Sequence, residues 1–227
     1  MIKLIIGVLV FVVVLKLIQN KVIIRFDTFF RKGFKKHNDN YGVFCWVGKQ
    51  GDGKTYSCCD FISEVRGNKK VITNQWKYSQ LNQDFCIYEP NFYTIIDKFN
   101  DGTYDKNYII FYDELFTLLE KGKLSKNILT FISQLRKREI YLVTTVQEWL
   151  DINVTFRRYV RFQVDCFMFN FLGLFALSIN MIHDGYKMHW DQLENEYVAP
   201  IIKTTVKKCS KRIADSYDTF EVIKINE

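Results

Sequence analysis

The chain has 227 residues and a formal net charge of +7, with 32 Lys and Arg against 25 Asp and Glu. Its hydrophobic fraction of 48% and charged fraction of 25% are those of a globular protein, which excludes wholesale disorder. Two prolines, eleven glycines and no internal repeat exclude collagen-like, low-complexity and solenoid architectures. The basic balance favours a polyanionic partner, either nucleic acid or an anionic membrane surface.

The first segment predicts a membrane anchor. Residues 2–18 are apolar apart from Lys3, Lys16 and glycine, and no polar side chain interrupts residues 4–15. As a helix they would span about 25 Å, which suits a hydrocarbon core of roughly 30 Å when the lysines reach the headgroups. No small-residue cleavage site follows, which favours an uncleaved anchor over a signal peptide, and a buried core helix is the other alternative. We therefore expect residues 1–20 to cross the membrane once.

Residues 21–40 predict a basic juxtamembrane segment. Lys21, Arg25, Lys32 and Lys36 recur at helical spacing, with aromatic residues on another face. Such an amphipathic stretch suits the headgroup region, although a solvated charged face is an alternative. Because the positive charge follows the anchor, the positive-inside rule places the remaining chain in the cytoplasm, at the inner membrane of a host if the protein is viral.

A phosphate-binding motif follows a short apolar run at residues 41–47, which has the composition of a buried strand. Residues 48–55, GKQGDGKT, fit G-x-x-x-x-G-K-[ST] at every fixed position. Glycines let the backbone wrap a phosphate, and successive N–H groups at the start of a helix, expected over residues 54–65, then face the anion. Lys54 would reach the β- and γ-phosphates of ATP, and Thr55 would bind Mg²⁺. The predicted nucleotide contacts are Gly48, Lys49, Gln50, Gly51, Asp52, Gly53, Lys54, Thr55 and Tyr56.

An acidic pair marks the end of a second predicted strand. Residues 108–112, YIIFY, are continuously apolar, as expected of a strand buried on both faces of a parallel sheet. Asp113 and Glu114 follow directly, where the carboxyl ends of such strands meet the ligand crevice. We expect Asp113 to hold Mg²⁺ and Glu114 to act as general base on the attacking water. A surface Asp-Glu pair is common, and the upstream phosphate loop is what makes this one informative.

A third predicted strand, residues 140–143, is flanked by an amide and by arginines. Gln147 would contact the γ-phosphate or the attacking water, unless it only caps a loop. A helix capped by Ser125 precedes the strand and ends in a basic turn that contains Arg136. Either Arg136 or Arg157 would supply a trans-acting arginine to a neighbouring subunit. The alternative is that both arginines complement a helix dipole or a strand face.

The last third of the chain predicts a β-hairpin and a basic tail. Residues 156–164 suggest a strand with a basic face that lines a pore. Residues 166–182 suggest two buried strands joined by a turn near 170–173, with a second membrane span as the alternative. The start of the tail is lysine-rich and would contact phosphates or remain solvated. The predicted domains are the anchor 1–20, the juxtamembrane segment 21–40, a P-loop domain 41–200 and the tail 201–227.

Together these motifs resemble the FtsK–HerA superfamily of P-loop ATPases, and within it the Zot-like assembly ATPases of filamentous phages. The resemblance covers roughly residues 42–164 and rests on the motifs at 48–55, 108–114 and 134–147. It implies an α/β fold with a mostly parallel sheet flanked by helices. It also implies Lys54 and Thr55 as the Walker A pair, Asp113 and Glu114 as the Walker B pair, and Gln147 as the sensor.

The resemblance further implies a ring-like homo-oligomer that uses ATP and Mg²⁺ and acts on DNA with other assembly or virion proteins. The expected function is a membrane-anchored ATPase motor for DNA translocation, packaging or extrusion during virion assembly or DNA transfer. The alternative is a nucleotide-gated structural protein of a membrane assembly complex with little turnover. The intact Asp113–Glu114 pair favours the motor, because a pure binder has no need of Glu114.

Overall fold

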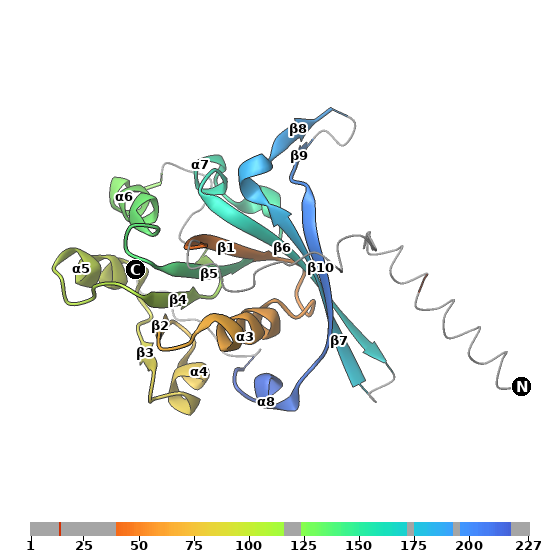
Figure 1. Ribbon diagram of the computed structural model, residues 1–227, viewed down its shortest axis with the longest axis horizontal. Helices are drawn as coiled ribbons and strands as arrows, with labels where there is room; N and C mark the ends of the chain where they lie inside the picture. The colour runs from red at the N-terminus through yellow and green to blue at the C-terminus, as the bar shows by residue number, and fades with distance from the viewer. Residues whose placement is uncertain (1–13, 15–39, 116–123, 172–174, 193–195, 219–227) are drawn as a thin grey trace, which may run out of the picture.

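The computed structural model has a central sheet with helices on both faces (Figure 1). It describes Val14 and residues 40–115, 124–171, 175–192 and 196–218. The predicted anchor at residues 2–18, apart from Val14, and nearly all of the juxtamembrane segment 21–40 lie outside the described residues. Within the described ranges, no helix is long and apolar enough to cross a membrane.

The main sheet has the strand order β10-β7-β6-β1-β5-β4-β2-β3. Its parallel part consists of β1 (Gly42–Val47), β2 (Lys70–Thr73), β3 (Cys86–Tyr88), β4 (Tyr108–Tyr112), β5 (Tyr141–Val146) and β6 (Val160–Phe171). Two further strands, β7 (Phe175–Asp184) and β10 (Ile201–Lys208), extend it in antiparallel fashion. A separate two-stranded sheet pairs β8 (His189–Asp191) with β9 (Glu196–Val198).

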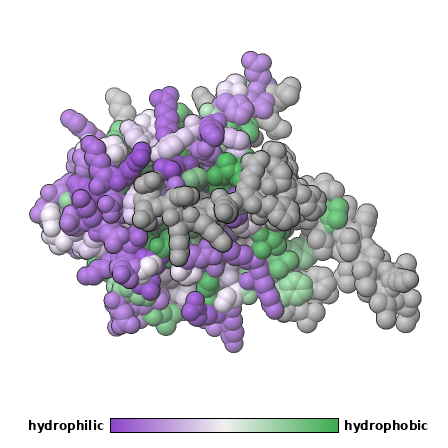
Figure 2. All heavy atoms as spheres, viewed as in Figure 1, coloured by the Kyte–Doolittle hydropathy of each residue, from purple (hydrophilic) through white to green (hydrophobic). Residues whose placement is uncertain are grey.

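Helices cover both faces of the sheet. One face carries α3 (Lys54–Val65), α4 (Trp76–Leu81) and α8 (Lys211–Ala214), and the other carries α5 (Phe92–Asn100) and α6 (Lys126–Gln134). The short elements η2 (Trp149–Asp151), α7 (Val154–Arg157) and η3 (Gly185–Lys187) flank the strands. The surface over α3 to α5 is mainly hydrophilic (Figure 2).

The continuous apolar character of the central strands follows from this two-sided burial. In β4, Ile109 and Phe111 pack in the cluster on the α3 side, whereas Ile110 and Tyr112 pack in the cluster on the α5 side. Successive strand residues point to opposite faces, so a strand with helices on both faces needs apolar residues at every position. The mostly parallel sheet, its flanking helices and the glycine-rich loop between β1 and α3 fit a P-loop NTPase α/β fold.

Several predicted elements are confirmed. The helix over residues 54–65 and the strand over 108–112 have the predicted bounds, and the strand predicted at 140–143 extends over Tyr141–Val146. Ser125 caps α6 and accepts a hydrogen bond from the Ile128 N–H at 3.3 Å. The predicted hairpin is the antiparallel pair β6–β7, with the residues between its strands, 172–174, outside the described part.

The strand predicted over residues 156–164 is wrong in its first half. Arg157 ends helix α7 and Arg158 follows it, so β6 begins only at Val160. A local cap explains the difference, because the Asn153 side chain accepts a hydrogen bond from the Thr155 N–H at 2.8 Å and starts a helical turn. The basic strand face is therefore reduced to Arg161.

The basic tail predicted from residue 201 is also wrong at its start. Residues 201–208 form β10, which pairs with β7 at an edge of the main sheet. Lys207 Nζ lies 2.6 Å from Asp60 Oδ2 and 2.5 Å from Glu64 Oε1, which joins β10 to α3. Lysines on an edge strand discourage pairing with other chains, so the charge that suggested a solvated tail belongs to a sheet edge.

Candidate nucleotide site

The carboxyl ends of four parallel strands lie level with one another along one side of the sheet, and this row of strand ends is the edge at which the site lies. Val47, the last residue of β1, pairs with Val146, the last residue of β5, and β4 and β2 lie alongside in matching register. The residues that follow these strands therefore meet at the same edge, where open α/β sheets bind their ligands. Among them are Gly48, Asp113 and Gln147 from the predicted site.

The glycine-rich loop is closed by its own hydrogen bonds. Gly53, the N-cap of α3, has φ 78°, a left-handed conformation that favours glycine. The Lys49 N–H donates to Asp52 Oδ2 at 2.6 Å. Lys54 Nζ donates to the carbonyl oxygens of Gly48 at 2.8 Å and of Lys49 at 3.0 Å. The Lys54 ammonium thus lies against the loop, where a bound phosphate would replace carbonyl oxygens as its partner.

The Asp113 carboxylate lies beside Thr55 of the loop. Asp113 is 7% exposed, and its Oδ2 accepts hydrogen bonds from Thr55 Oγ1 at 3.2 Å and from Gln75 Nε2 at 2.8 Å. Thr145 Oγ1 donates to the other carboxylate oxygen, Oδ1. Three side chains from α3, the end of β2 and β5 therefore fix the orientation of one buried carboxylate.

Hydrogen bonds also hold the backbone of the acidic pair. Asn74 Nδ2 donates to the Asp113 carbonyl at 3.0 Å, and Asn74 Oδ1 accepts from the Asp113 N–H at 2.9 Å. The Glu114 N–H donates to Thr145 Oγ1 at 3.0 Å. Glu114 has φ 55°, an uncommon conformation for a residue with a side chain and one that recurs at functional sites.

Both carboxyl groups of the pair have raised pKa values. For Asp113, burial raises the pKa, while the hydrogen bonds from Thr145, Thr55 and Gln75 and the charge of Lys54 oppose the rise. For Glu114, burial and the neighbouring Asp113 charge raise the pKa, and Lys54 lowers it. A carboxylate with a raised pKa accepts a proton more readily near neutral pH, which suits Glu114 to the role of general base.

The donor set at this edge fits Mg²⁺. The Thr55 hydroxyl and the Asp113 carboxylate offer oxygen atoms 3.2 Å apart. Mg²⁺ prefers oxygen ligands and usually takes only one or two from protein, leaving the others to phosphates and water. Thr55 and Asp113 are thus the residues that would hold the ion.

The remaining predicted contacts are placed in different ways. Lys49, Gln50 and Gly51 are exposed on the loop, and Gln147 is exposed directly after β5. Tyr56 is buried in the core, and its hydroxyl accepts a hydrogen bond from the Ser210 N–H at 2.7 Å. The Tyr56 side chain therefore points into the protein, which leaves only its backbone to contact a nucleotide.

The two predicted arginines lie toward the opposite edge of the sheet. Arg136 is exposed in the turn before β5, and Arg157 precedes Val160 of β6, which pairs with Val43 near the start of β1. Neither arginine lies at the phosphate edge of its own subunit. Arg157 is only 8% exposed, so of the two only Arg136 has an exposed side chain.

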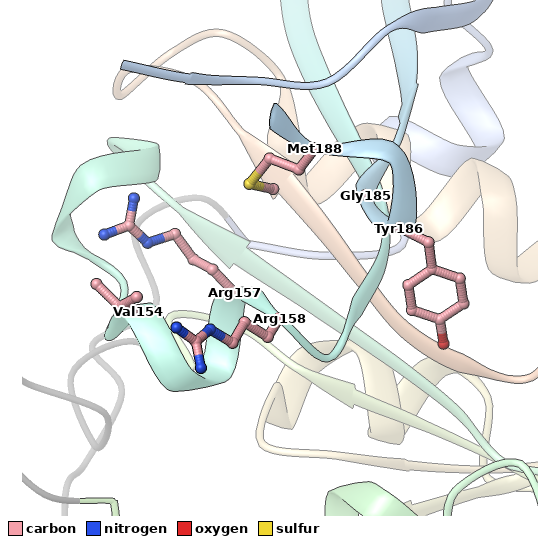
Figure 3. A pocket seen from close by; sticks show the side chains of 6 residues that line it. All are labelled: Val154, Arg157, Arg158, Gly185, Tyr186 and Met188. Atoms are coloured by element: carbon pink, nitrogen blue, oxygen red, sulfur yellow. The ribbon is translucent and has the colours of Figure 1, made fainter. Parts of the chain in front are cut away.

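Arg157 and Arg158 line a hollow of about 340 Å³ at the start of β6 (Figure 3). Both side chains and Met188 lie together on one side, whereas the Tyr186 ring turns away from them. Two guanidinium groups make this a basic concavity, separate from the loop at residues 48–55.

Sequence reasoning missed Asn74 and Gln75 and gave no role to the Thr145 side chain. The signal was present, since a short strand-like run, Lys70–Thr73, is followed directly by two amides, as other strand ends here are followed by polar residues. What the sequence did not provide was the pairing of β2 with β4, which brings these amides to Asp113.

No protein-family model matches the chain, and no curated protein matches it in sequence. Solved structures that resemble it include the N-terminal domain of zonular occludens toxin from Neisseria meningitidis, at 14% identity and a TM-score of 0.48, covering 78% of this chain and 100% of that one. The genome packaging NTPase B204 of Sulfolobus turreted icosahedral virus 2, solved with ATP-gammaS, resembles it at 13% identity and a TM-score of 0.48, covering 77% and 98%.

The flagellar accessory protein FlaH from Methanocaldococcus jannaschii gives 12% identity and a TM-score of 0.47, covering 73% of this chain and 89% of that one. The zonular occludens toxin domain is thus among the structures that resemble the chain, in agreement with the resemblance that the motifs indicated. Because these TM-scores are below 0.5, the fold and site rest on the strand order and contacts described above.

Two adjacent threonines test the hydrogen bonds around Asp113. Thr145→Val should lower the free energy of unfolding by about 1–3 kcal/mol, because it leaves a buried carboxylate without one donor and the Glu114 N–H without its acceptor. Thr144→Val is the matched control. The Thr144 hydroxyl is buried and, within the described residues, has no hydrogen-bond partner, so its loss should be neutral or stabilising. Urea denaturation of both variants measures the difference, and equal effects would contradict the assigned role of Thr145.

Proposed function

We propose that this chain is a P-loop ATPase. The observation that carries the proposal is the contact between Thr55 of the glycine-rich loop and Asp113 at the end of β4, 58 residues apart in the sequence. This contact brings the phosphate-binding loop next to Asp113, so that Thr55 and Asp113 could share a Mg²⁺ ion. Glu114 follows Asp113 directly in the chain. These are the parts that hydrolysis of a nucleoside triphosphate needs.

Each part has a distinct role in the proposed reaction. The loop N–H groups and the Lys54 ammonium bind and neutralise the phosphates. Bound Mg²⁺ would supply further positive charge at the phosphate oxygens, held by Thr55 and Asp113. Glu114 orients the attacking water and accepts its proton, and Gln147, at the end of β5, contacts the γ-phosphate or that water.

We further propose that hydrolysis drives movement of DNA during virion assembly or DNA transfer. The motifs resemble those of the Zot-like assembly ATPases, and a net charge of +7 suits a polyanionic partner. The basic hollow at Arg157 and Arg158 lies away from the phosphate loop and would remain accessible to a second ligand while ATP is bound. In this proposal the chain is anchored through residues 2–18, works in the cytoplasm as a ring-like homo-oligomer, and acts with other assembly or virion proteins.

Two substitutions separate nucleotide binding from turnover. Lys54→Ala should weaken ATP binding at least about a hundredfold, because it removes the charge that neutralises the phosphates. Glu114→Gln, which keeps the shape of the side chain, should bind ATP within about threefold of the parent and lose turnover by about 10²–10⁴. Fluorescent-nucleotide titration and steady-state phosphate release, with and without DNA, measure both. Binding without turnover in the parent protein would instead support the nucleotide-gated structural role.

The anchor proposal is tested by removing residues 1–20. The shortened protein should leave the membrane fraction and keep its nucleotide binding, because the P-loop domain begins near residue 40. Residual attachment that fades at high salt would come from the basic residues 21–36, because salt screens their attraction to anionic headgroups. Changing Lys21, Arg25, Lys32 and Lys36 to Gln in the shortened protein should remove this residual attachment. Retention of the shortened protein after alkaline extraction would contradict a single N-terminal anchor.

The ring proposal assigns a trans-acting role to Arg136. Arg136→Ala should reduce turnover about 10³-fold with little loss of ATP binding, because a positive charge at the γ-phosphate acts mainly in the transition state. Lys137→Ala, which removes the adjacent exposed charge, is the matched control. Mixing Arg136→Ala with Lys54→Ala protein should restore part of the activity, since an intact loop then meets an intact arginine. Full activity of Arg136→Ala would refute the trans-acting role of Arg136, and full activity of a dilute monomer would refute the ring.

A further inference from the structure

Gln75 lies beside the Walker B carboxylate although it belongs to another strand. It follows β2 by two residues, and the parallel pairing of β2 with β4 aligns Thr73 with Phe111, which brings Gln75 near Asp113. The Gln75 side chain is 3% exposed, and its Nε2 donates to Asp113 Oδ2 at 2.8 Å. A buried amide contributes little apolar packing, so the Gln75 side chain acts here mainly through its hydrogen bonds.

The Gln75 bond and the Thr55 bond share one carboxylate oxygen. Thr55 Oγ1 also donates to Asp113 Oδ2, at 3.2 Å, while Thr145 holds Oδ1. A Thr55 hydroxyl that turned toward a bound cation would leave the Gln75 amide as the donor to Oδ2 among the residues that the structure describes. Gln75 is therefore placed to keep the carboxylate in one orientation in the presence and absence of the ion.

The other end of the amide lacks a partner. Gln75 Oε1 is buried and accepts no hydrogen bond from any described residue. Exchanging the amide nitrogen and oxygen would not satisfy it, because an oxygen would then face the Asp113 carboxylate oxygen. Buried acceptors in native proteins are nearly always satisfied, by ordered water or by a ligand where protein donors are absent. An unsatisfied acceptor beside a metal-binding carboxylate suits a water molecule that belongs to a hydrated Mg²⁺ ion, which usually keeps several of its waters.

We propose that Gln75 is a positioning residue of the magnesium–nucleotide site. Its Nε2 holds the Asp113 carboxylate, and its Oε1 accepts a hydrogen bond from a water molecule bound to the cation. This inference rests on the proposed ATPase function. Residues that orient metal ligands in this way commonly affect metal affinity by 10- to 100-fold.

The test compares nucleotide binding with and without the cation. ATP-gammaS affinity is measured by calorimetry for the full chain, once in MgCl₂ and once in EDTA. Gln75→Met keeps the length of the side chain and removes both hydrogen-bonding atoms. It should leave the affinity in EDTA within about twofold and reduce the gain in affinity from Mg²⁺ about tenfold or more, with a matching rise in the Mg²⁺ concentration needed for half-maximal turnover.

Two further variants sharpen the result. Gln83→Met makes the same change at an exposed glutamine outside the site, and it should leave the Mg²⁺ dependence unchanged. Should Gln75→Met fail to fold, Gln75→Asn, whose amide is one methylene shorter, takes its place under the same criteria.

The possible outcomes are distinct. Two results for Gln75→Met would overturn the assignment of Gln75 while leaving the ATPase proposal intact. One is an increase in nucleotide affinity on adding Mg²⁺ that stays within twofold of the parent's. The other is a loss of affinity that is equal in MgCl₂ and in EDTA. Absence of any Mg²⁺-dependent nucleotide binding in the parent chain would instead refute the proposed function.

Discussion

Burial of the Asp113 carboxylate is the constraint on which the rest of the site depends. A carboxylate removed from water needs hydrogen-bond donors, or it takes up a proton instead. Its donors are Thr55 from α3, Gln75 from the end of β2 and Thr145 from β5. Burial still raises the pKa of Asp113, and these donors together with the Lys54 charge oppose that rise. One carboxylate therefore ties α3, β5 and the residues after β2 to the end of β4.

The accuracy of this arrangement comes from the register of the parallel sheet. Side chains can meet around one carboxylate only if their strands end level with one another, and main-chain ladders fix those ends. Asn74 extends this control past the end of β2, because its amide bonds both the N–H and the carbonyl of Asp113. From β5, the Thr145 hydroxyl accepts a hydrogen bond from the Glu114 N–H. Hydrogen bonds from two neighbouring strand ends thus hold the backbone at Asp113 and Glu114, where Glu114 has a left-handed conformation.

The sequence predicted what local patterns encode. The helix over residues 54–65 and the strand over 108–112 have the expected bounds, because a glycine-rich loop followed by a helix and an apolar run ending in acids are signals within a few residues. Gln75 escaped notice because its partner lies 38 residues away, and only the pairing of β2 with β4 joins them. Likewise residues 201–208 were predicted as the start of a basic tail that contacts phosphates or remains solvated, because lysines look the same in sequence whether they lie on a tail or pair with α3. The spacing of residues in the sequence does not show which polar side chains meet when strands far apart in the chain pair in the sheet.

Different groups lie at the two ends of the central strands, and β6 runs from one end to the other. Val160 at its start pairs with Val43, next to the hollow that Arg157 lines, and Asp165 pairs with Val47, where the phosphate loop begins. Farther along, the carbonyl of Cys166 lies only 3.1 Å from where a side-chain carbon at Gly48 would be. Strand β6 thus serves both places: its start flanks the hollow, and its Cys166 carbonyl leaves little room for a side chain at Gly48, the first residue of the loop.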